Sequence, residues 1–232
     1  LLYRAEDGEP LATLEANLLG QIRTGAASGL ATRYMARSES ETVGIIGSGF
    51  QAETQLAAMR VVRSIRTVRV WSRSVERRSA FAARLGAEAV ETARQAVEDS
   101  DIVVTATNAK DPVFEAGWIA NGTHINAMGS NQASRRELPA DVLSRAETIA
   151  VDSIEQAEME SGDLLLARAE GRWRGVNLFE LKDIVAGKKK GRDSKADITI
   201  FKSNGLAVED VAAAGWVYER AVEAGIGRKN YS

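Results

Sequence analysis

The stretch Thr42-Val43-Gly44-Ile45-Ile46-Gly47-Ser48-Gly49-Phe50-Gln51-Ala52 decides the fold of this chain. Its first five residues form a short apolar run of the kind that builds a buried parallel strand. The turn that follows has the pattern G-x-G-x-x-A and opens a helix expected over 50–62. The first glycine permits a tight turn, the second lets the backbone approach a pyrophosphate, and Ala52 brings helix and strand together. Because the helix start also offers free N–H groups, the stretch predicts a dinucleotide site; the alternative is a purely structural Gly-rich turn.

Strands and helices alternate along the rest of the chain. We expect further strands at 67–71, 89–90, 101–105, 124–127, 148–151 and 197–201, and helices at 17–36, 74–85, 153–160 and 206–224. Alternation at this spacing predicts an α/β fold with a Rossmann-type, doubly wound parallel sheet covered by helices on both faces. A hairpin with Asp7-Gly8 as its turn precedes these elements. Since strand-like sequence begins at residue 1, we expect that earlier sequence is missing.

Composition excludes several classes of protein. The chain has 232 residues, enough for one large domain or two modest ones, with 30 basic and 32 acidic side chains. This balance argues against a nucleic-acid partner and a polybasic membrane anchor. Without cysteine and with one histidine, disulfides and thiolate nucleophiles are excluded and no metal site is expected. No apolar run approaches the roughly 18 residues of a membrane span, so we expect a soluble, cytoplasmic protein.

The end of the strand at 67–71 bears on the kind of dinucleotide. An NAD site usually places Asp or Glu there to bind the ribose 2′-OH, whereas this chain continues Ser72-Arg73-Ser74, with Arg77 and Arg78 one turn later. A guanidinium pairs well with a 2′-phosphate. NADP(H) is therefore favoured, NAD(H) stays possible, and Arg77 and Arg78 could equally form a solvated helix face.

Two small, polar loops follow other strands, Thr105-Ala106-Thr107-Asn108 and Met128-Gly129-Ser130-Asn131. Loops at the carboxyl ends of strands border the cofactor crevice in such folds, so both suit ribose and nicotinamide. His124 begins its strand at the opposite end, where we expect a structural role. Two features each have two interpretations. The small residues at 24–31 indicate either tight helix packing or a helix that faces a ligand. The basic run at 188–192 indicates either a solvated loop or an anion site.

Several motifs together resemble the ornithine cyclodeaminase/mu-crystallin family over essentially the whole chain. They are Arg23-Thr24-Gly25-Ala26-Ala27-Ser28, the Gly47–Ala52 turn, Gly122-Thr123-His124-Ile125-Asn126-Ala127-Met128-Gly129, Arg136-Glu137-Leu138 and Phe201-Lys202-Ser203-Asn204-Gly205-Leu206. The resemblance implies an NAD(P)-binding Rossmann domain at 38–152. Residues 1–37 and 153–232 would form parts of a substrate and dimerisation domain whose N-terminal portion is absent, in a homodimer.

The resemblance also implies roles for particular residues. Arg23 would bind the substrate carboxylate, Arg73 the 2′-phosphate, and Asn131 falls where ornithine cyclodeaminase has its acid-base Asp. An amide orients ligands but does not shuttle a proton at neutral pH. The predicted catalytic residues are Arg23 and Asn131, and the predicted cofactor-binding residues are Thr24, Gly47, Gly49, Phe50, Gln51, Ser72, Arg73, Ser74, Thr105, Ala106, Thr107, Met128, Gly129, Ser130, Ser203 and Asn204.

The family's chemistry implies hydride transfer at Cα of a small L-amino acid or cyclic imino acid, by an imine or ketimine reductase or an amino-acid dehydrogenase. One alternative is a cyclodeaminase-type lyase that forms proline and ammonia from ornithine and recycles its NAD; Asn131 argues against it. The other is an NADPH-binding protein without catalysis. The resemblance also implies an Arg and a Lys that hold or polarise substrate, and we expect both in a segment that precedes residue 1.

Overall fold

The structure, a computed structural model, describes residues 1–228. Its contacts divide the chain into two compact units. The larger unit is Thr24–Asn204, and the smaller unit combines residues 1–23 with the described residues from Gly205 onward. Helix α1, Asn17–Met35, contributes its first residues to the smaller unit and the rest to the larger.

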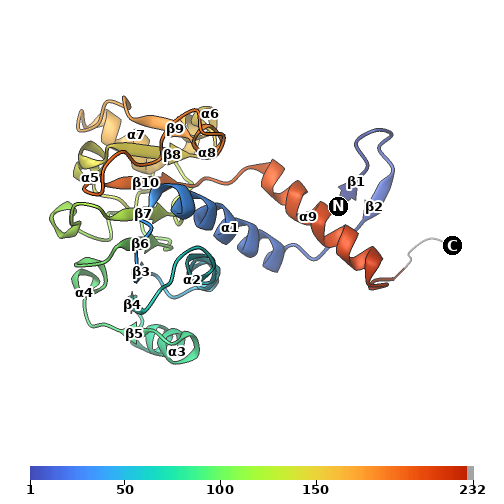
Figure 1. Cartoon of the computed structure of the whole chain (residues 1–232), viewed down its shortest axis with the longest axis horizontal. Coiled ribbons are helices and arrows are strands. Elements are labelled where there is room, and N and C mark those ends of the chain that lie inside the picture. The colour runs from blue at the N-terminus through green and yellow to red at the C-terminus, as the bar shows by residue number, and fades with distance from the viewer. Residues whose placement is uncertain (229–232) are drawn as a thin grey trace. The chain divides into compact units, whose positions relative to one another are not determined.

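The larger unit is built on a parallel sheet of eight strands among the described residues, in the order β5-β4-β3-β6-β7-β10-β8-β9 (Figure 1). This confirms the predicted α/β fold. The strands are β3 Thr42–Ile46, β4 Thr67–Trp71, β5 Glu88–Ala89, β6 Ile102–Thr105, β7 His124–Ala127, β8 Thr148–Val151, β9 Leu178–Glu180 and β10 Thr199–Lys202.

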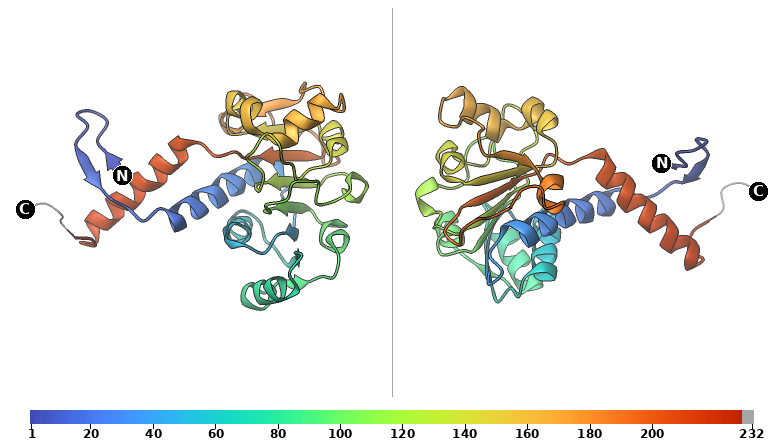
Figure 2. Two further views of the ribbon diagram at one scale, coloured as in Figure 1. Left: turned by 180° about the vertical axis from the view of Figure 1, so that it is seen from behind. Right: turned by 45° about the horizontal axis from the view of Figure 1, so that its top comes forward.

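Helices cover both faces of this sheet, as Figure 2 shows. Successive strand residues face opposite layers: Ile45 belongs to the buried cluster that contains Leu56 and Phe81, whereas Ile46 belongs to the cluster that contains Val97 and Leu143. Being buried on both faces, the strands read as continuous apolar runs. The helices of the larger unit after α1 are α2 Phe50–Val62, α3 Val75–Leu85, α4 Ala93–Val97, the 3-10 turn η1 Ala116–Trp118, α5 Ala140–Arg145, α6 Ile154–Glu160, α7 Gly162–Ala169 and α8 Leu181–Val185.

Strand β10 lies inside the sheet although it comes last in the chain. It pairs in parallel with β7 on one side and β8 on the other. Ile200 and Phe201 are fully buried, one in each face. The predicted domain boundaries after residues 37 and 152 therefore fall inside the larger unit, because β9 and β10 extend the sheet and buried residues of α1 pack on it.

The smaller unit contains a hairpin and a helix. Strands β1 (Leu2–Tyr3) and β2 (Pro10–Ala12) pair antiparallel, and the Gly8 N–H donates to the Arg4 carbonyl at 2.9 Å in the predicted turn. Helix α9 spans Ala207–Glu223 and has no buried residue. Within the part of the chain that the structure describes, no helix is both long and apolar enough to cross a bilayer.

Candidate functional site

The turn after β3 has the geometry that its glycines predict. Gly47 has φ = +117°, which side chains other than glycine rarely adopt, and its N–H donates to the Trp71 carbonyl at 2.9 Å. A Cβ on Gly47 would lie 2.3 Å from the Ala106 carbonyl oxygen. The first glycine is therefore required for the fold itself, because both the conformation and the space exclude a side chain.

The second glycine leaves the start of α2 open. Gly49 is the N-cap residue, with φ = −89°, and no side chain in the described residues caps the helix there. A Cβ on Gly49 would meet no atom within 4 Å among the described residues. Phe50 beside it is 72% exposed, whereas Ala52 is fully buried against the sheet. Uncapped N–H groups facing open space at a helix start fit a pyrophosphate.

The loop after β4 places Arg73 at the surface. Ser48 Oγ donates to Ser72 Oγ at 2.9 Å, and Ser72 Oγ donates to the Ser74 carbonyl at 3.1 Å, so the turns after β3 and β4 are joined. Ser74 caps α3. Arg73 is exposed and forms no hydrogen bond or ion pair among the described residues.

The two arginines one turn later differ. Arg77 is exposed on α3, whereas Arg78 is only 5% exposed. The Arg78 guanidinium donates to the Ser72 carbonyl at 3.1 Å and to Glu91 Oε2 at 2.8 Å. Arg78 therefore supports the loop that presents Arg73, so the two arginines do not form one solvated face.

A buried carboxylate joins the loops after β6 and β7. Glu137 Oε1 accepts from the Thr107 N–H at 2.7 Å and from Thr107 Oγ1 at 2.6 Å. Its Oε2 accepts from Thr105 Oγ1 at 2.9 Å and from the Gly129 N–H at 2.7 Å. Glu137 is fully buried, and burial raises the pKa of its carboxyl group.

A buried lysine joins the next pair of strand ends. Lys202 Nζ donates to the carbonyls of Ser130 and of Ser203, the latter at 2.9 Å. Asp163 Oδ2 lies 3.7 Å from the same Nζ, and its Oδ1 accepts from the backbone N–H groups of residues 137–138 at 2.7 and 2.8 Å. Both side chains are fully buried, and burial raises the pKa of Asp163.

Sequence reasoning missed this network. Glu137 and Lys202 stood within quoted motifs without an assigned role, and Asp163 was not singled out. A signal was present for Lys202, because it follows the apolar run Ile198–Phe201 where a lysine is rarely buried unless paired. For Glu137 the contacts come from distant parts of the chain, which no local pattern reveals.

The remaining predicted cofactor residues of the larger unit have varied surroundings. The Met128 sulfur accepts from Ser28 Oγ at 3.0 Å, and the Asn204 N–H donates to Asp152 Oδ2 at 2.6 Å. Asn131 is exposed. Thr24 is buried, and its carbonyl accepts from the side chain of a glutamine on α2.

Tight packing accounts for the small residues of α1. A Cβ on Gly25 would lie 2.6 Å from the Thr54 carbonyl oxygen on α2, and one on Gly29 would lie 3.1 Å from the Ala58 Cβ. Glycine thus allows two helix backbones to approach. This favours the packing interpretation over a ligand-facing helix.

Arg23 lies in the smaller unit and is paired with α9. Its Nε donates to Asp210 Oδ1 and its Nη1 to Glu209 Oε2, both at 2.9 Å. An arginine carries five N–H donors in a fixed plane, and these two pairs use two of them. The pairs hold the guanidinium in one orientation.

Other candidates have structural roles. His124 is fully buried, its Nδ1 lies 2.9 Å from Thr199 Oγ1, and burial together with the Arg192 charge lowers its pKa to about 3. This agrees with the structural role predicted for it. Arg192 itself donates to backbone carbonyls, among them those of Met35 at 2.8 Å and Gly122 at 3.1 Å, so the basic run ends in a structural arginine.

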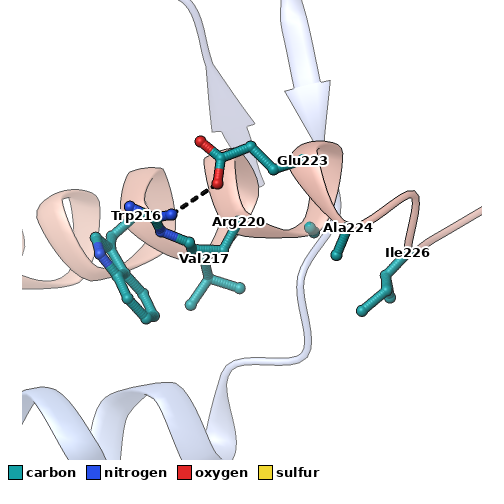
Figure 3. Close-up of a pocket in the computed structure, with 7 residues that line it drawn as sticks. Trp216, Val217, Arg220, Glu223, Ala224 and Ile226 are labelled. Carbon is teal, nitrogen blue, oxygen red and sulfur yellow. Dashed lines mark hydrogen bonds and ion pairs between the residues drawn. The ribbon is translucent and has the colours of Figure 1, made fainter.

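A shallow apolar hollow lies along α9 (Figure 3). Trp216 is 61% exposed, Ile226 is 71% exposed, and Arg220 pairs with Glu223 at 2.7 Å. No residue predicted to bind cofactor or substrate lines this hollow. We assign no ligand to it.

Comparison with known proteins agrees with this arrangement. The sequence model of the ornithine cyclodeaminase/mu-crystallin family matches residues 1–225. The chain belongs to this family. The resemblance inferred from the motifs is thereby confirmed.

Individual members are similar over almost the whole chain. A Delta(1)-pyrroline-2-carboxylate reductase of Bacillus cereus is 42% identical over 236 residues, which cover 99% of this chain and 72% of the relative. The structure of Thermococcus litoralis Delta(1)-pyrroline-2-carboxylate reductase in complex with NADH and L-proline has a TM-score of 0.94 and 42% identity, covering 98% of this chain and 72% of that one. An archaeal alanine dehydrogenase dimer with bound NAD has a TM-score of 0.92 and 37% identity, covering 99% and 73%.

Proposed function

We propose that this protein is an NAD(P)-dependent imine reductase that reduces a cyclic imino acid such as pyrroline-2-carboxylate. The observation that carries the proposal is the open, uncapped start of α2 at Gly49, beside strand-end loops held by buried charges. The similarity to pyrroline-2-carboxylate reductases supports the choice of substrate. In this reaction the nicotinamide supplies a hydride to Cα of the imine.

The residues of the chain bind and orient the reactants. We assign the pyrophosphate to the turn of Gly47 and Gly49 with the first N–H groups of α2, and the nicotinamide ribose and ring to the loops at 105–107 and 128–131 and to 203–204. We assign the substrate carboxylate to Arg23, as the family resemblance implies, through N–H groups that its pairs with Glu209 and Asp210 leave unused. The Asn131 amide orients a ligand through hydrogen bonds and moves no proton.

The test is a turnover assay with the full chain. Pyrroline-2-carboxylate, piperideine-2-carboxylate and pyruvate with ammonia are each offered with NADPH and with NADH, and loss of reduced nicotinamide is followed. We expect turnover with the cyclic imines, and a rise in KM of at least about tenfold in Arg23→Gln, since hydrogen bonds to charged groups are worth ~1.5–3 kcal/mol.

Two results would contradict the proposal. Proline formed from ornithine without net cofactor turnover would identify a cyclodeaminase. Tight NADPH binding without turnover of any substrate would identify a non-catalytic binding protein.

We further propose a preference for NADP(H) over NAD(H). Arg73 is exposed, free of partners among the described residues, and stands where an NAD site usually has a carboxylate. The two similar structures contain NADH and NAD, and this describes the cofactors bound by those two proteins. Arg73→Gln should raise the Kd for NADPH about tenfold or more and leave the Kd for NADH nearly unchanged. Arg77→Gln, an exposed arginine on the same helix start, is the matched control; equal effects of both variants would refute the assignment.

We also propose a homodimer. The similar alanine dehydrogenase is a dimer, and α9 has several exposed apolar side chains, including Val208 and Val211. Light scattering of the purified chain at several concentrations tests this; a monomer at all concentrations would refute it.

A further inference from the structure

Three neighbouring strands of the sheet carry the loops assigned to the nicotinamide end of the cofactor. β6, β7 and β10 are adjacent in the sheet order, and they pair in parallel. Their carboxyl ends lead into residues 105–107, 128–131 and 203–204, so these segments emerge at one edge of the sheet. Nothing in the strand pairing itself fixes how the loops beyond that edge are spaced.

Glu137 fixes the first pair of loops. Its two oxygens accept four hydrogen bonds, two from Thr107 and one each from Thr105 and Gly129. Each oxygen thus uses two acceptor positions, and every donor belongs to the ends of β6 and β7. A glutamine of the same shape has one oxygen and one NH₂ group, so in either orientation it would turn a donor toward donors.

Lys202 fixes the second pair. Its ammonium bonds the carbonyls of Ser130 and Ser203, which belong to the ends of β7 and β10. Asp163 connects Lys202 to the backbone at Glu137, because it faces the ammonium with Oδ2 and accepts from the backbone N–H groups of residues 137–138 with Oδ1. A continuous chain of contacts therefore links all three strand ends.

We propose that Glu137, Asp163 and Lys202 act as one buried positioning unit that sets the spacing of the three nicotinamide loops. This inference rests on the proposed function and names the residues through which the chain orients the cofactor ring. Buried ion pairs are weak devices for stability alone, because removing charges from water offsets most of their attraction. Here the side-chain hydrogen bonds of Glu137 and Lys202 among the described residues all go to loops assigned to the cofactor, which is what a positioning role requires.

The chain offers a matched control at the opposite edge of the sheet. Asp101 accepts from the N–H groups of Glu41 at 2.8 Å and Thr42 at 3.0 Å, and pairs with Arg37 at 2.5 Å. It is also a carboxylate that joins two segments to a cation, although both side chains of this pair are partly exposed. It contacts the beginnings of strands and no predicted cofactor residue, so Asp101→Asn tests the general cost of losing such a carboxylate.

The experiment compares Glu137→Gln and Asp101→Asn with the unaltered chain, well below the unfolding temperature of each. In Glu137→Gln we expect faster hydrogen exchange at the amide of Thr107 or of Gly129, by roughly 5- to 150-fold, since one of them loses a buried acceptor. With cyclic imine and NADPH we expect kcat to fall by about 10- to 100-fold. Asp101→Asn should leave both quantities within about twofold of the unaltered chain.

A second variant keeps the inference testable if Glu137→Gln does not fold. Lys202→Met retains the volume of the side chain and removes the donor to Ser130 and Ser203, and it should also lower kcat. Glu137→Asp keeps both oxygens on a shorter side chain and should recover part of the activity lost in the glutamine variant. If folded Glu137→Gln and Lys202→Met both retain kcat within about twofold, the positioning role is refuted.

Failure of the proposed function would give a different pattern. An unaltered chain that binds neither NADPH nor NADH in a fluorescence titration would refute the cofactor assignment, and the positioning role with it. A chain that binds the cofactor while Glu137→Gln shows normal exchange and normal kcat would refute only the positioning unit.

Discussion

The two glycines of the turn after β3 should respond to alanine in opposite ways. At Gly49 an added methyl group enters open space, and φ = −89° suits any residue. Alanine is a poorer N-cap than glycine, but it also lowers the entropy of the unfolded chain. These effects oppose each other, so the free energy of unfolding of Gly49→Ala should stay within about 1 kcal/mol of the original value.

The same methyl group should obstruct the cofactor. It would project into the open space over the first turn of α2, which we assign to the pyrophosphate. Close approach of the backbone to a pyrophosphate is the reason for a glycine at this position. We expect the Kd for NADPH to rise at least about tenfold, which corresponds to ~1.4 kcal/mol.

At Gly47 the cost falls on the fold. Alanine would have to adopt φ = +117° and place its Cβ 2.3 Å from the Ala106 carbonyl oxygen. A strained backbone conformation costs about 1–3 kcal/mol, and overpacking costs about 1–3 kcal/mol more. The free energy of unfolding of Gly47→Ala should therefore fall by roughly 2–6 kcal/mol, and the Tm by roughly 4–24 °C.

Thermal unfolding by circular dichroism and titration with NADPH, monitored by its fluorescence, separate the two effects. Each glycine variant serves as the control for the other. If Gly49→Ala binds NADPH with unchanged affinity, the pyrophosphate does not lie on this turn. If Gly49→Ala loses as much stability as Gly47→Ala, a side chain at position 49 does not enter open space, and this part of the reasoning is refuted.

Three further predictions concern stability. Burial lowers the pKa of His124 to about 3 in the folded chain, whereas the unfolded chain binds this proton near pH 6.5. The free energy of unfolding should therefore decrease as the pH falls below about 6.5. In urea titrations His124→Gln should lose about 2 kcal/mol less of this free energy than the unaltered chain between pH 7.5 and pH 5. Gly25→Ala should lower the Tm through a loss of about 1–3 kcal/mol, because its Cβ would lie 2.6 Å from the Thr54 carbonyl oxygen; an unchanged Tm would contradict the close helix contact. Arg63 donates to several carbonyls at the end of α1, so Arg63→Met should cost about 1–3 kcal/mol and speed hydrogen exchange in the last turn of that helix, whereas uniform exchange changes would contradict a capping role.

Local patterns were sufficient to predict most of the sheet and its first turn. The helix expected over 50–62 is α2, and the strands expected at 42–46, 67–71, 124–127 and 148–151 have the observed bounds. These elements combine apolar runs with turn or capping residues that lie beside them in sequence. The capping box of Thr92 and Gln95 at the start of α4 is another local signal of this kind.

Elements set by distant contacts were harder to predict. The short β9 and α8 have no clear periodicity. The position of β10 between β7 and β8 is set by pairing between segments that are far apart in the chain. A sequence run cannot reveal its neighbours in a sheet.

The candidate site shows the same division. The residues of the Gly-rich turn were predictable because their roles depend on backbone conformation within a few positions. The contacts of Glu137 join residues 8 to 32 positions away, and those of Lys202 reach back 72 positions.

The distribution of buried charges supports placing the site at the carboxyl edge of the sheet. At the amino edge, Asp101 and Arg192 direct their hydrogen bonds to backbone groups where strands begin, and His124 is kept neutral by burial. Those groups complete the fold. At the carboxyl edge, the buried side chains of Glu137 and Lys202 form hydrogen bonds to the loops after the strands. The start of α2 has uncapped N–H groups beside open space. Exposed, uncapped N–H groups at the start of a helix, beside loops that buried charges hold in place, fit an anionic ligand at this edge.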